Sequence, residues 1–185
     1  PGIDAPGIVG PQHLILNGLP MNRHLANFPR LAANFDHVTS LSMRDANVLG
    51  SQGAFLENFP QLRALDLGGN AMNRLPPAIG ELRQLTNLML DNNQIVLTPQ
   101  AVARLRNMTR LEVLWMQDNP LGLVPDVSQM SNLQVLNLAR TGIDQWPVGL
   151  FGKSRPRHIY LNLEHNRLVN IPEVAPGSFR AELLA

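Results

Sequence analysis

One spacing of apolar residues occurs in four stretches of the chain: LRALDLGGNAM at residues 62–72, LTNLMLDNNQI at 85–95, LEVLWMQDNPL at 111–121 and LQVLNLARTGI at 133–143. Two weaker copies flank them, VTSLSMRDANV at 38–48 and HIYLNLEHNRL at 158–168. The six copies begin 22 to 26 residues apart, at positions 38, 62, 85, 111, 133 and 158. A self-similar period of this length indicates a solenoid built from stacked coils.

The shared pattern, L-x-x-L-x-L-x-x-N-x-L, is that of leucine-rich repeats, which run to about 20 to 29 residues. Apolar residues dominate the first, fourth, sixth and eleventh positions, and we expect them to point into the solenoid while the residues between them alternate outward along a short strand. The sequence therefore predicts an α/β leucine-rich repeat solenoid, wound as a right-handed superhelix. Its parallel β-sheet lies on the concave face, with short helices and turns on the convex face.

The ninth position of most copies holds an asparagine, whose amide we expect to turn inward and satisfy backbone groups at the bend after each strand. This structural ladder comprises Asn70, Asn93, Asn119, Thr141 and Asn166. Thr141 offers a single hydroxyl, which predicts a local weakening without a break. Ala46 offers no polar group in the first copy, where Asn47 beside it is a substitute if the bend is shifted.

The sequence predicts four divisions: a loose Pro/Gly-rich N-terminal segment (1–12), an N-terminal cap with a capping strand (13–37), six repeats (38–168), and a C-terminal cap or the start of a following domain (169–185). Leu14 and Leu16 lie one repeat length before the first copy and supply the capping strand. Because the sequence starts at Pro1, we expect it to be part of a longer protein.

The segments that return along the convex side show helical spacing of apolar residues. We expect helices at 51–59, 76–84 and 97–108, a single turn at 125–132, and a mobile loop at 149–158. Ser51 is the predicted N-cap of the first helix, and Thr98 followed by Pro99 predicts the start of the third.

The outward third and fifth positions of each strand map the concave face. They place an apolar patch in its middle, formed by Met89, Val113, Trp115, Val135 and Tyr160 and accompanied by Asn87, Asn137 and Asn162. Exposed apolar clusters with tryptophan and tyrosine are typical of protein interfaces. We therefore predict that this surface binds a partner. The alternatives are that a loop or neighbouring domain of the same protein covers it, or that the patch is incidental.

The seventh and eighth positions line the rim where the strands turn, and the candidate rim residues are Asp91, Asp118, Arg140, Glu164 and His165. Its three carboxylates form an acidic edge able to attract an arginine or hold calcium weakly. A solvated polar rim is the favoured interpretation, because the order of these residues does not match a calcium-binding loop.

Composition excludes several classes of function. The 185 residues are 44% hydrophobic, enough for one domain, and the formal net charge of +1 gives no general reason to expect nucleic acid or an anionic membrane as partner. The sequence has no cysteine, no long apolar run, no glycine-rich nucleotide motif and no histidine pair at metal-binding spacing. We expect no catalytic residue, no metal and no cofactor in these residues.

The sequence between the consensus positions resembles a narrower family. The run from Leu90 to Phe151 and the run RPRHIYLNLEHNRLVNIPEVAPGSF at 155–179 are similar to the leucine-rich region of large pseudomonad proteins that carry a C-terminal NEL domain. The likeness covers roughly residues 13–185. NEL domains are cysteine-type ubiquitin ligases of bacterial effectors. The best-known enterobacterial members use compact repeats of about 20 residues, and these are longer.

The resemblance implies that the repeats select a host protein substrate or restrain the ligase domain of their own chain. It also implies that the protein is secreted or translocated into host cytoplasm. No catalytic residue transfers, because the family's cysteine lies in the ligase domain. The single lysine, Lys153, against 14 arginines fits a module that avoids self-modification and fits GC-rich coding equally well. The alternative is a stand-alone binding or scaffold protein with no attached enzyme, in the bacterial cytoplasm.

Overall fold

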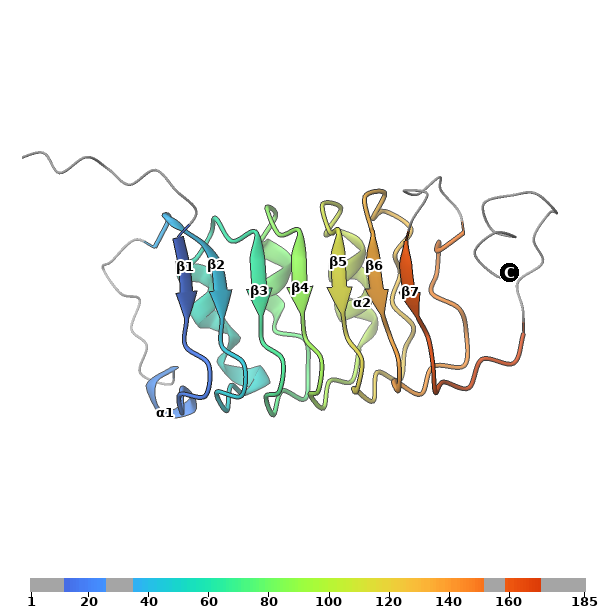
Figure 1. The fold of residues 1–185 in the computed structure, drawn as a ribbon, viewed down its shortest axis with the longest axis horizontal. Helices are drawn as coiled ribbons and strands as arrows, with labels where there is room; N and C mark the ends of the chain where they lie inside the picture. The colour runs from blue at the N-terminus through green and yellow to red at the C-terminus, as the bar shows by residue number, and fades with distance from the viewer. Residues whose placement is uncertain (1–11, 26–34, 152–158, 171–185) are drawn as a thin grey trace, which may run out of the picture.

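The structure, a computed structural model, describes residues 12–25, 35–151 and 159–170, and all structural statements concern these ranges. Its elements are β1 (Gln12–Ile15), α1 (Asn22–Leu25), β2 (Val38–Ser42), η1 (Gly50–Asn58), β3 (Ala64–Asp66), η2 (Pro77–Glu81), β4 (Asn87–Met89), α2 (Pro99–Arg106), β5 (Val113–Trp115), β6 (Val135–Asn137) and β7 (Tyr160–Asn162). The seven strands form one parallel sheet in chain order, with η1, η2 and α2 behind it (Figure 1).

Each strand after β2 covers the third to fifth positions of its repeat. The central leucine of each of these strands pairs in register with the central leucine of the next, from Leu65 through Leu88, Leu114 and Leu136 to Leu161. Most of the repeats' inward positions are fully buried, with Leu65, Leu88, Leu114 and Leu136 all at 0% exposure. The predicted leucine-rich repeat solenoid is therefore confirmed, with its core between the sheet and the return segments.

The capping strand predicted around Leu14 is present as β1, which pairs with β2. It begins at Gln12, one residue earlier than the predicted boundary. Gly18 has φ +71° and occupies the place that later repeats use for their bend, and the Met21 N–H donates to the Ala46 carbonyl oxygen at 2.9 Å. The cap therefore copies the backbone course of a repeat without the asparagine.

The three predicted helices are found at about the expected positions, as η1, η2 and α2. Only α2 is an α-helix, as the spacing predicted. In α2 the Thr98 hydroxyl oxygen accepts from the Ala101 N–H at 3.2 Å, and Pro99 is at the first position, as expected. The segment at η1 is a 3₁₀-helix that starts at Gly50, so the prediction of Ser51 as N-cap is wrong. Instead, the Gln52 side-chain oxygen accepts from the Leu49 N–H at 3.0 Å.

Repeat length explains the difference in helix type. The repeat that contains α2 is the longest, with 26 residues between Leu85 and Leu111, and it has room for two α-helical turns. The shorter repeats cross the same distance with fewer residues, and a 3₁₀-helix rises about 2.0 Å per residue against 1.5 Å for an α-helix. The shortest repeat has no helix at 125–132, where Asp126 bridges to Val148. Most of the predicted mobile loop, residues 152–158, lies outside the described residues.

The ninth-position asparagines bond to the backbone of two coils at once. The Asn119 amide nitrogen donates to the carbonyl oxygens of Leu90, Met116 and Gln117, and its oxygen accepts from the Ile95 N–H at 3.0 Å. Equivalent sets of bonds surround three more asparagines: Asn70, Asn93 and Asn166. Each amide therefore joins its own coil to the preceding one.

Thr141 interrupts this series between the fourth and fifth coils. Its hydroxyl donates to the Leu138 carbonyl oxygen at 2.8 Å, within its own coil. Its other hydroxyl contact is with Asn166, in the coil that follows. The Leu121 N–H, which an asparagine would have bonded, donates to the Asn119 carbonyl oxygen instead. The buried amide link is therefore missing at this one joint within the six repeats.

The eighth position of every repeat adopts a left-handed backbone, a feature that sequence analysis missed. The φ angles are +51° at Asp45, +68° at Gly69, +52° at Asn92, +58° at Asp118, +54° at Arg140 and +57° at His165. Asn, Asp and Gly tolerate this region well, whereas larger side chains adopt it at a cost. The bend after each strand, and not the side chain, therefore sets the conformation of Arg140 and His165.

Candidate protein-binding surface

The register of the sheet places the predicted patch residues side by side on the face turned away from the helices, here called the sheet face. Asn87 pairs with Val113, Val113 with Val135, and Val135 with Tyr160. In the second column Met89 lies beside Trp115, followed by Asn137 and Asn162. Neighbouring strands lie about 4.8 Å apart, so adjacent side chains in a column touch.

Two aromatic side chains on this face are exposed, Trp115 on the inner strand β5 and Tyr160 on β7, the last strand of the described sheet. Trp115 is 38% exposed and Tyr160 is 57% exposed, while Met89, Val113 and Val135 are partly exposed. In Figure 1 no labelled helix crosses in front of the strands, so no described helix shields these residues. Their role in binding remains a prediction.

The asparagines on the sheet face also fix the ends of the strands. The Asn137 side-chain oxygen accepts from the Ala139 N–H at 3.1 Å, and that of Asn162 accepts from the Glu164 N–H at 3.0 Å. Asp66 makes the same contact with the Gly68 N–H. These side chains are therefore held by the bend two residues further on, which gives the polar part of the sheet face a fixed shape.

The rim is not a free acidic edge, because two of its three carboxylates are already paired with arginines. Arg44 crosses the next coil to reach Asp91, with Nη2 at 2.7 Å from Oδ2 and Nη1 at 3.0 Å from Oδ1, and it also contacts Asp66 at 2.8 Å. The hydrogen bond to Asp91 raises the pKa of Arg44 despite the opposing effect of burial. This clamp ties three successive coils, and sequence analysis missed it because Arg44 and Asp91 are 47 residues apart.

A second pair holds the rim at the fourth and fifth coils. Arg140 Nε lies 2.6 Å from Asp118 Oδ1, and Arg140 Nη2 lies 2.9 Å from Oδ2. The hydrogen bond from Arg140 is the main reason that the pKa of the Asp118 carboxyl lies below its ordinary value. Glu164 and His165 are exposed, as is Arg140, so this part of the rim is solvated although Asp118 and Arg140 are paired.

Gly68 is the residue that lets the Arg44 clamp form. A Cβ at this position would lie 2.2 Å from Arg44 Nη1. We therefore expect Gly68→Ala to displace the guanidinium from the largely buried Asp91 and to lower the free energy of unfolding by about 1 to 2 kcal/mol. The expected loss is smaller than for a fully buried ion pair, because solvent screens the partly exposed Arg44. Urea unfolding followed by circular dichroism measures this loss.

The matched control is Gly80→Ala, whose added Cβ meets only ordinary contacts at 3.4 Å or more. It should change stability by less than about 0.5 kcal/mol in the destabilising direction. In an Arg44→Ala background the effect of Gly68→Ala should disappear, because no guanidinium remains to be displaced. An undiminished loss in that background would contradict the clamp.

The described residues hold no group of three or more His, Asp and Glu side chains that could bind a metal ion. Within the same ranges no helix is long and apolar enough to span a membrane.

No family model matches this sequence, and no curated protein matches it. Among solved structures, the chain is similar to the leucine-rich repeat ectodomain of the plant membrane receptor kinase GASSHO1/SCHENGEN3 from Arabidopsis thaliana, solved in complex with CASPARIAN STRIP INTEGRITY FACTOR 2. The identity is 31% and the TM-score 0.47, over 57% of this chain and 13% of that one.

Two bacterial structures match over more of the chain. An internalin from Listeria monocytogenes is 16% identical with a TM-score of 0.46, over 85% of this chain and 62% of that one. A leucine-rich repeat protein of Leptospira interrogans is 19% identical with a TM-score of 0.36, over 87% of this chain and 56% of that one. This chain thus spans less than two thirds of the length of all three structures.

The class of this protein follows from its own repeats and geometry. Six consensus copies, a parallel sheet paired coil by coil, and inward asparagines that join successive coils define a leucine-rich repeat solenoid. Its candidate functional site is the sheet face, where an apolar patch containing Trp115 and Tyr160 is exposed.

Proposed function

We propose that this solenoid is a protein-interaction module and that the sheet face binds the partner. The observation that carries the proposal is the exposure of Trp115 and Tyr160 beside Val113 and Val135 on a face that no described helix covers. Aromatic residues in such a position are enriched among the residues that dominate binding energy. Asn137 and Asn162, whose side chains bond to the backbone two residues further on, supply polar groups at fixed positions beside them.

The resemblance to the repeat region of NEL proteins supports a finer proposal. In it the module selects a host protein substrate for a cysteine-type ubiquitin ligase carried by the same protein, which is secreted or translocated into host cytoplasm. The alternative is a stand-alone binding or scaffold protein. The two differ in one measurement, ubiquitin transfer to the bound partner by the full-length protein. Transfer that falls with the affinity of sheet-face variants supports the ligase, and binding without transfer supports the scaffold.

Trp115→Ala should weaken partner binding by about 2 kcal/mol or more, which is roughly 30-fold in Kd. The reason is that truncation removes the largest exposed apolar side chain of the patch. The measurement is a pull-down from eukaryotic cell lysate with wild type and variant, followed by mass spectrometry and titration of the protein that is retained.

Val148→Ala is the matched control, because Val148 is a 52% exposed apolar residue outside the patch. It should retain the same partner with unchanged affinity. If Trp115→Ala and wild type retain the same proteins equally well, the sheet face is not the binding surface, and the patch instead packs against another part of its own protein.

A further inference from the structure

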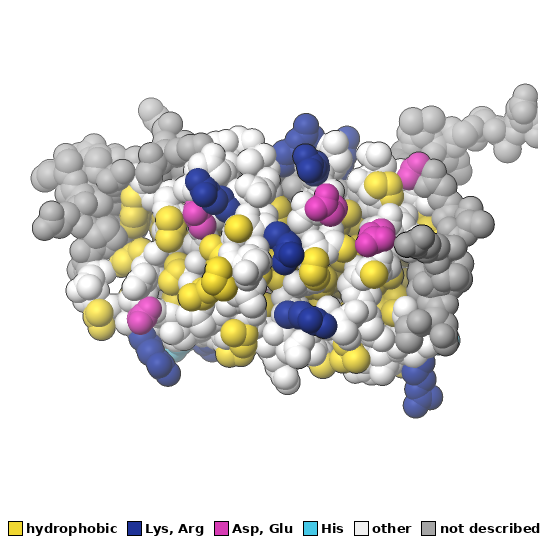
Figure 2. Space-filling model, turned by 180° about the vertical axis from the view of Figure 1, so that it is seen from behind, with side chains coloured by type: hydrophobic (Ala, Val, Ile, Leu, Met, Phe, Trp, Pro, Cys, Tyr) yellow, Lys and Arg dark blue, Asp and Glu magenta, His cyan; other side chains and the backbone are white. Residues whose placement is uncertain are grey.

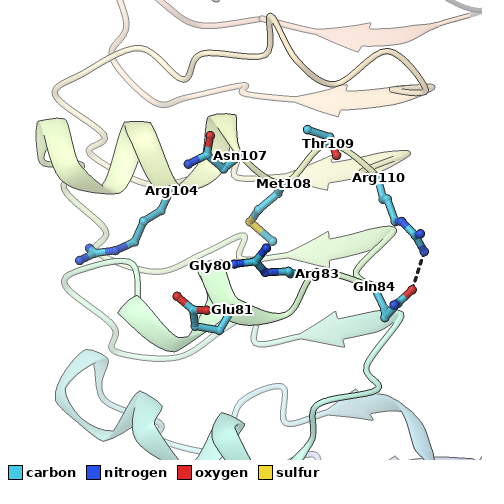
Figure 3. Close-up of a pocket in the computed structure, with 9 residues that line it drawn as sticks. All are labelled: Gly80, Glu81, Arg83, Gln84, Arg104, Asn107, Met108, Thr109 and Arg110. Atoms are coloured by element: carbon cyan, nitrogen blue, oxygen red, sulfur yellow. Dashed lines mark hydrogen bonds between the residues drawn. The ribbon is translucent and has the colours of Figure 1, made fainter.

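A second surface feature lies on the opposite, helical face. A hollow of about 550 Å³ separates η2 from α2 and the segment after it, within the size range of ligand sites. Figure 3 shows its lining, which includes three arginines (Arg83, Arg104 and Arg110) and a single carboxylate, Glu81. Figure 2, a view of the helical side, shows several arginine side chains near the middle of this face, with acidic side chains among them.

The three arginines of this hollow have no ion-pair partner in the described part of the chain. The arginines that do pair with aspartates there are Arg44, Arg106 and Arg140. Arg83, Arg104 and Arg110 against Glu81 leave an excess of two positive charges around one hollow. An uncompensated cluster of this kind attracts an anion.

Two of these arginines contact neighbouring residues of the hollow. The stem of Arg104 packs over Gly80, where an added Cβ would lie 3.4 Å from the Arg104 Cβ and Cγ atoms. The Arg110 guanidinium donates to the Gln84 side-chain oxygen (Figure 3). The bond from Arg110 to Gln84 lowers the entropy cost of holding the Arg110 guanidinium in place for a ligand.

The arrangement favours an extended ligand over a compact one. In Figure 3 the Arg83 guanidinium lies between those of Arg104 and Arg110, which point away from each other along the hollow. A single phosphate contacts only part of such a row, whereas a peptide with several carboxylates reaches all of it. Gln84, Asn107 and Thr109 add neutral hydrogen-bonding groups suited to a peptide backbone.

We propose that the hollow between η2 and α2 binds an extended acidic segment of a protein, with Arg83 at its centre and Arg104 and Arg110 at its two ends. Guanidinium groups bind carboxylates through paired hydrogen bonds, which lysines do not reproduce. This site is separate from the sheet face, so the two surfaces bind independently.

The test is titration of fluorescein-labelled hexaglutamate by fluorescence anisotropy at 50 mM salt, with hexaglutamine as the neutral probe. Wild type should bind hexaglutamate and not hexaglutamine, with affinity that falls as salt is raised. Arg83→Gln should weaken binding at least tenfold. Arg106→Gln is the matched control, because Arg106 lies on α2 like Arg104 but pairs with Asp126 and does not line the hollow. This change should alter Kd less than twofold.

Three results would overturn the proposal. They are the absence of hexaglutamate binding, an equal loss in Arg83→Gln and Arg106→Gln, or competition by inorganic pyrophosphate at lower concentration than by unlabelled hexaglutamate, which would identify a compact anion site. Trp115→Ala should leave hexaglutamate binding unchanged. Failure at the hollow and failure at the sheet face are therefore distinguished by separate variants.

Discussion

Leu114→Ala is expected to lower the free energy of unfolding by about 2 to 5 kcal/mol. Leu114 is fully buried in the middle of β5 and lies in register between Leu88 and Leu136. Truncation leaves a cavity that these neighbours cannot fill, because the paired backbones on both sides fix their positions. Since Leu114 packs between the coils of Leu88 and Leu136, the loss falls on the contacts with both neighbouring coils at once.

Trp115→Ala, one residue further on, provides the comparison. Its side chain points to the opposite side of the strand and is 38% exposed, so we expect a smaller loss of stability than for Leu114→Ala. Urea unfolding of both variants, followed by circular dichroism, measures the difference. If the larger loss came from Trp115→Ala, the strand would be in the opposite register from that described.

Asn119→Ala is expected to cost about 2 to 4 kcal/mol, the second largest effect. The change removes one acceptor and three donor contacts of a residue that is 2% exposed. It removes the bonds that the Ile95 N–H and the Met116 carbonyl oxygen make with Asn119, whereas the Leu90 carbonyl oxygen keeps its bond from the Asn93 amide. A buried polar group left unsatisfied costs about 1 to 3 kcal/mol.

Two further substitutions sharpen this prediction. Asn132→Ala removes an exposed asparagine and should change stability by less than about 0.5 kcal/mol. Asn119→Thr should fall between wild type and Asn119→Ala, because Thr141 shows that a hydroxyl in this place bonds its own coil but not the preceding one. Equal losses for Asn119→Ala and Asn132→Ala would show that the amide ladder contributes nothing to stability.

The sequence was sufficient for the sheet and its register because both follow from the repeat. The apolar residues at the fourth and sixth positions of each repeat determine which side chains point inward. Because all repeats share this pattern, equivalent positions of successive coils lie in one column across the sheet. Trp115 and Tyr160 occupy a fifth and a third position of their repeats, so the same pattern places them on the sheet face. The inward asparagines could be foreseen for the same reason, since a polar residue at a constant place in an apolar pattern needs a constant partner.

Other features depended on contacts that a repeat pattern does not encode. The helix type of the return segments depends on how much distance each must cross, so η1 was predicted at about the right place with the wrong geometry. The clamp from Arg44 to Asp91 needs both a long side chain and the absence of one at Gly68. The hollow beside Arg83 brings together residues of two successive repeats, whose proximity on the helical face the consensus does not specify.

The joint between the fourth and fifth coils differs from the other joints of the six repeats in its response to ionic conditions. It lacks the buried amide, and an exposed pair, Arg140 with Asp118, bridges the same two coils. Because the pKa of folded Asp118 is lowered, the pair's contribution is present above the ordinary carboxyl range and is lost as pH falls through that lowered value. Mildly acidic surroundings therefore leave it intact.

Salt acts on this joint under ordinary conditions, because exposed charges are screened while buried amide bonds are not. The columns of the sheet face cross the same joint, with Trp115 on one side of it and Tyr160 on the other. Raising the ionic strength therefore weakens one of the contacts between the coils that carry the two aromatic residues, while the backbone pairing of their strands stays in place. A partner that contacts both would find a more rigid platform in dilute solution than in concentrated salt.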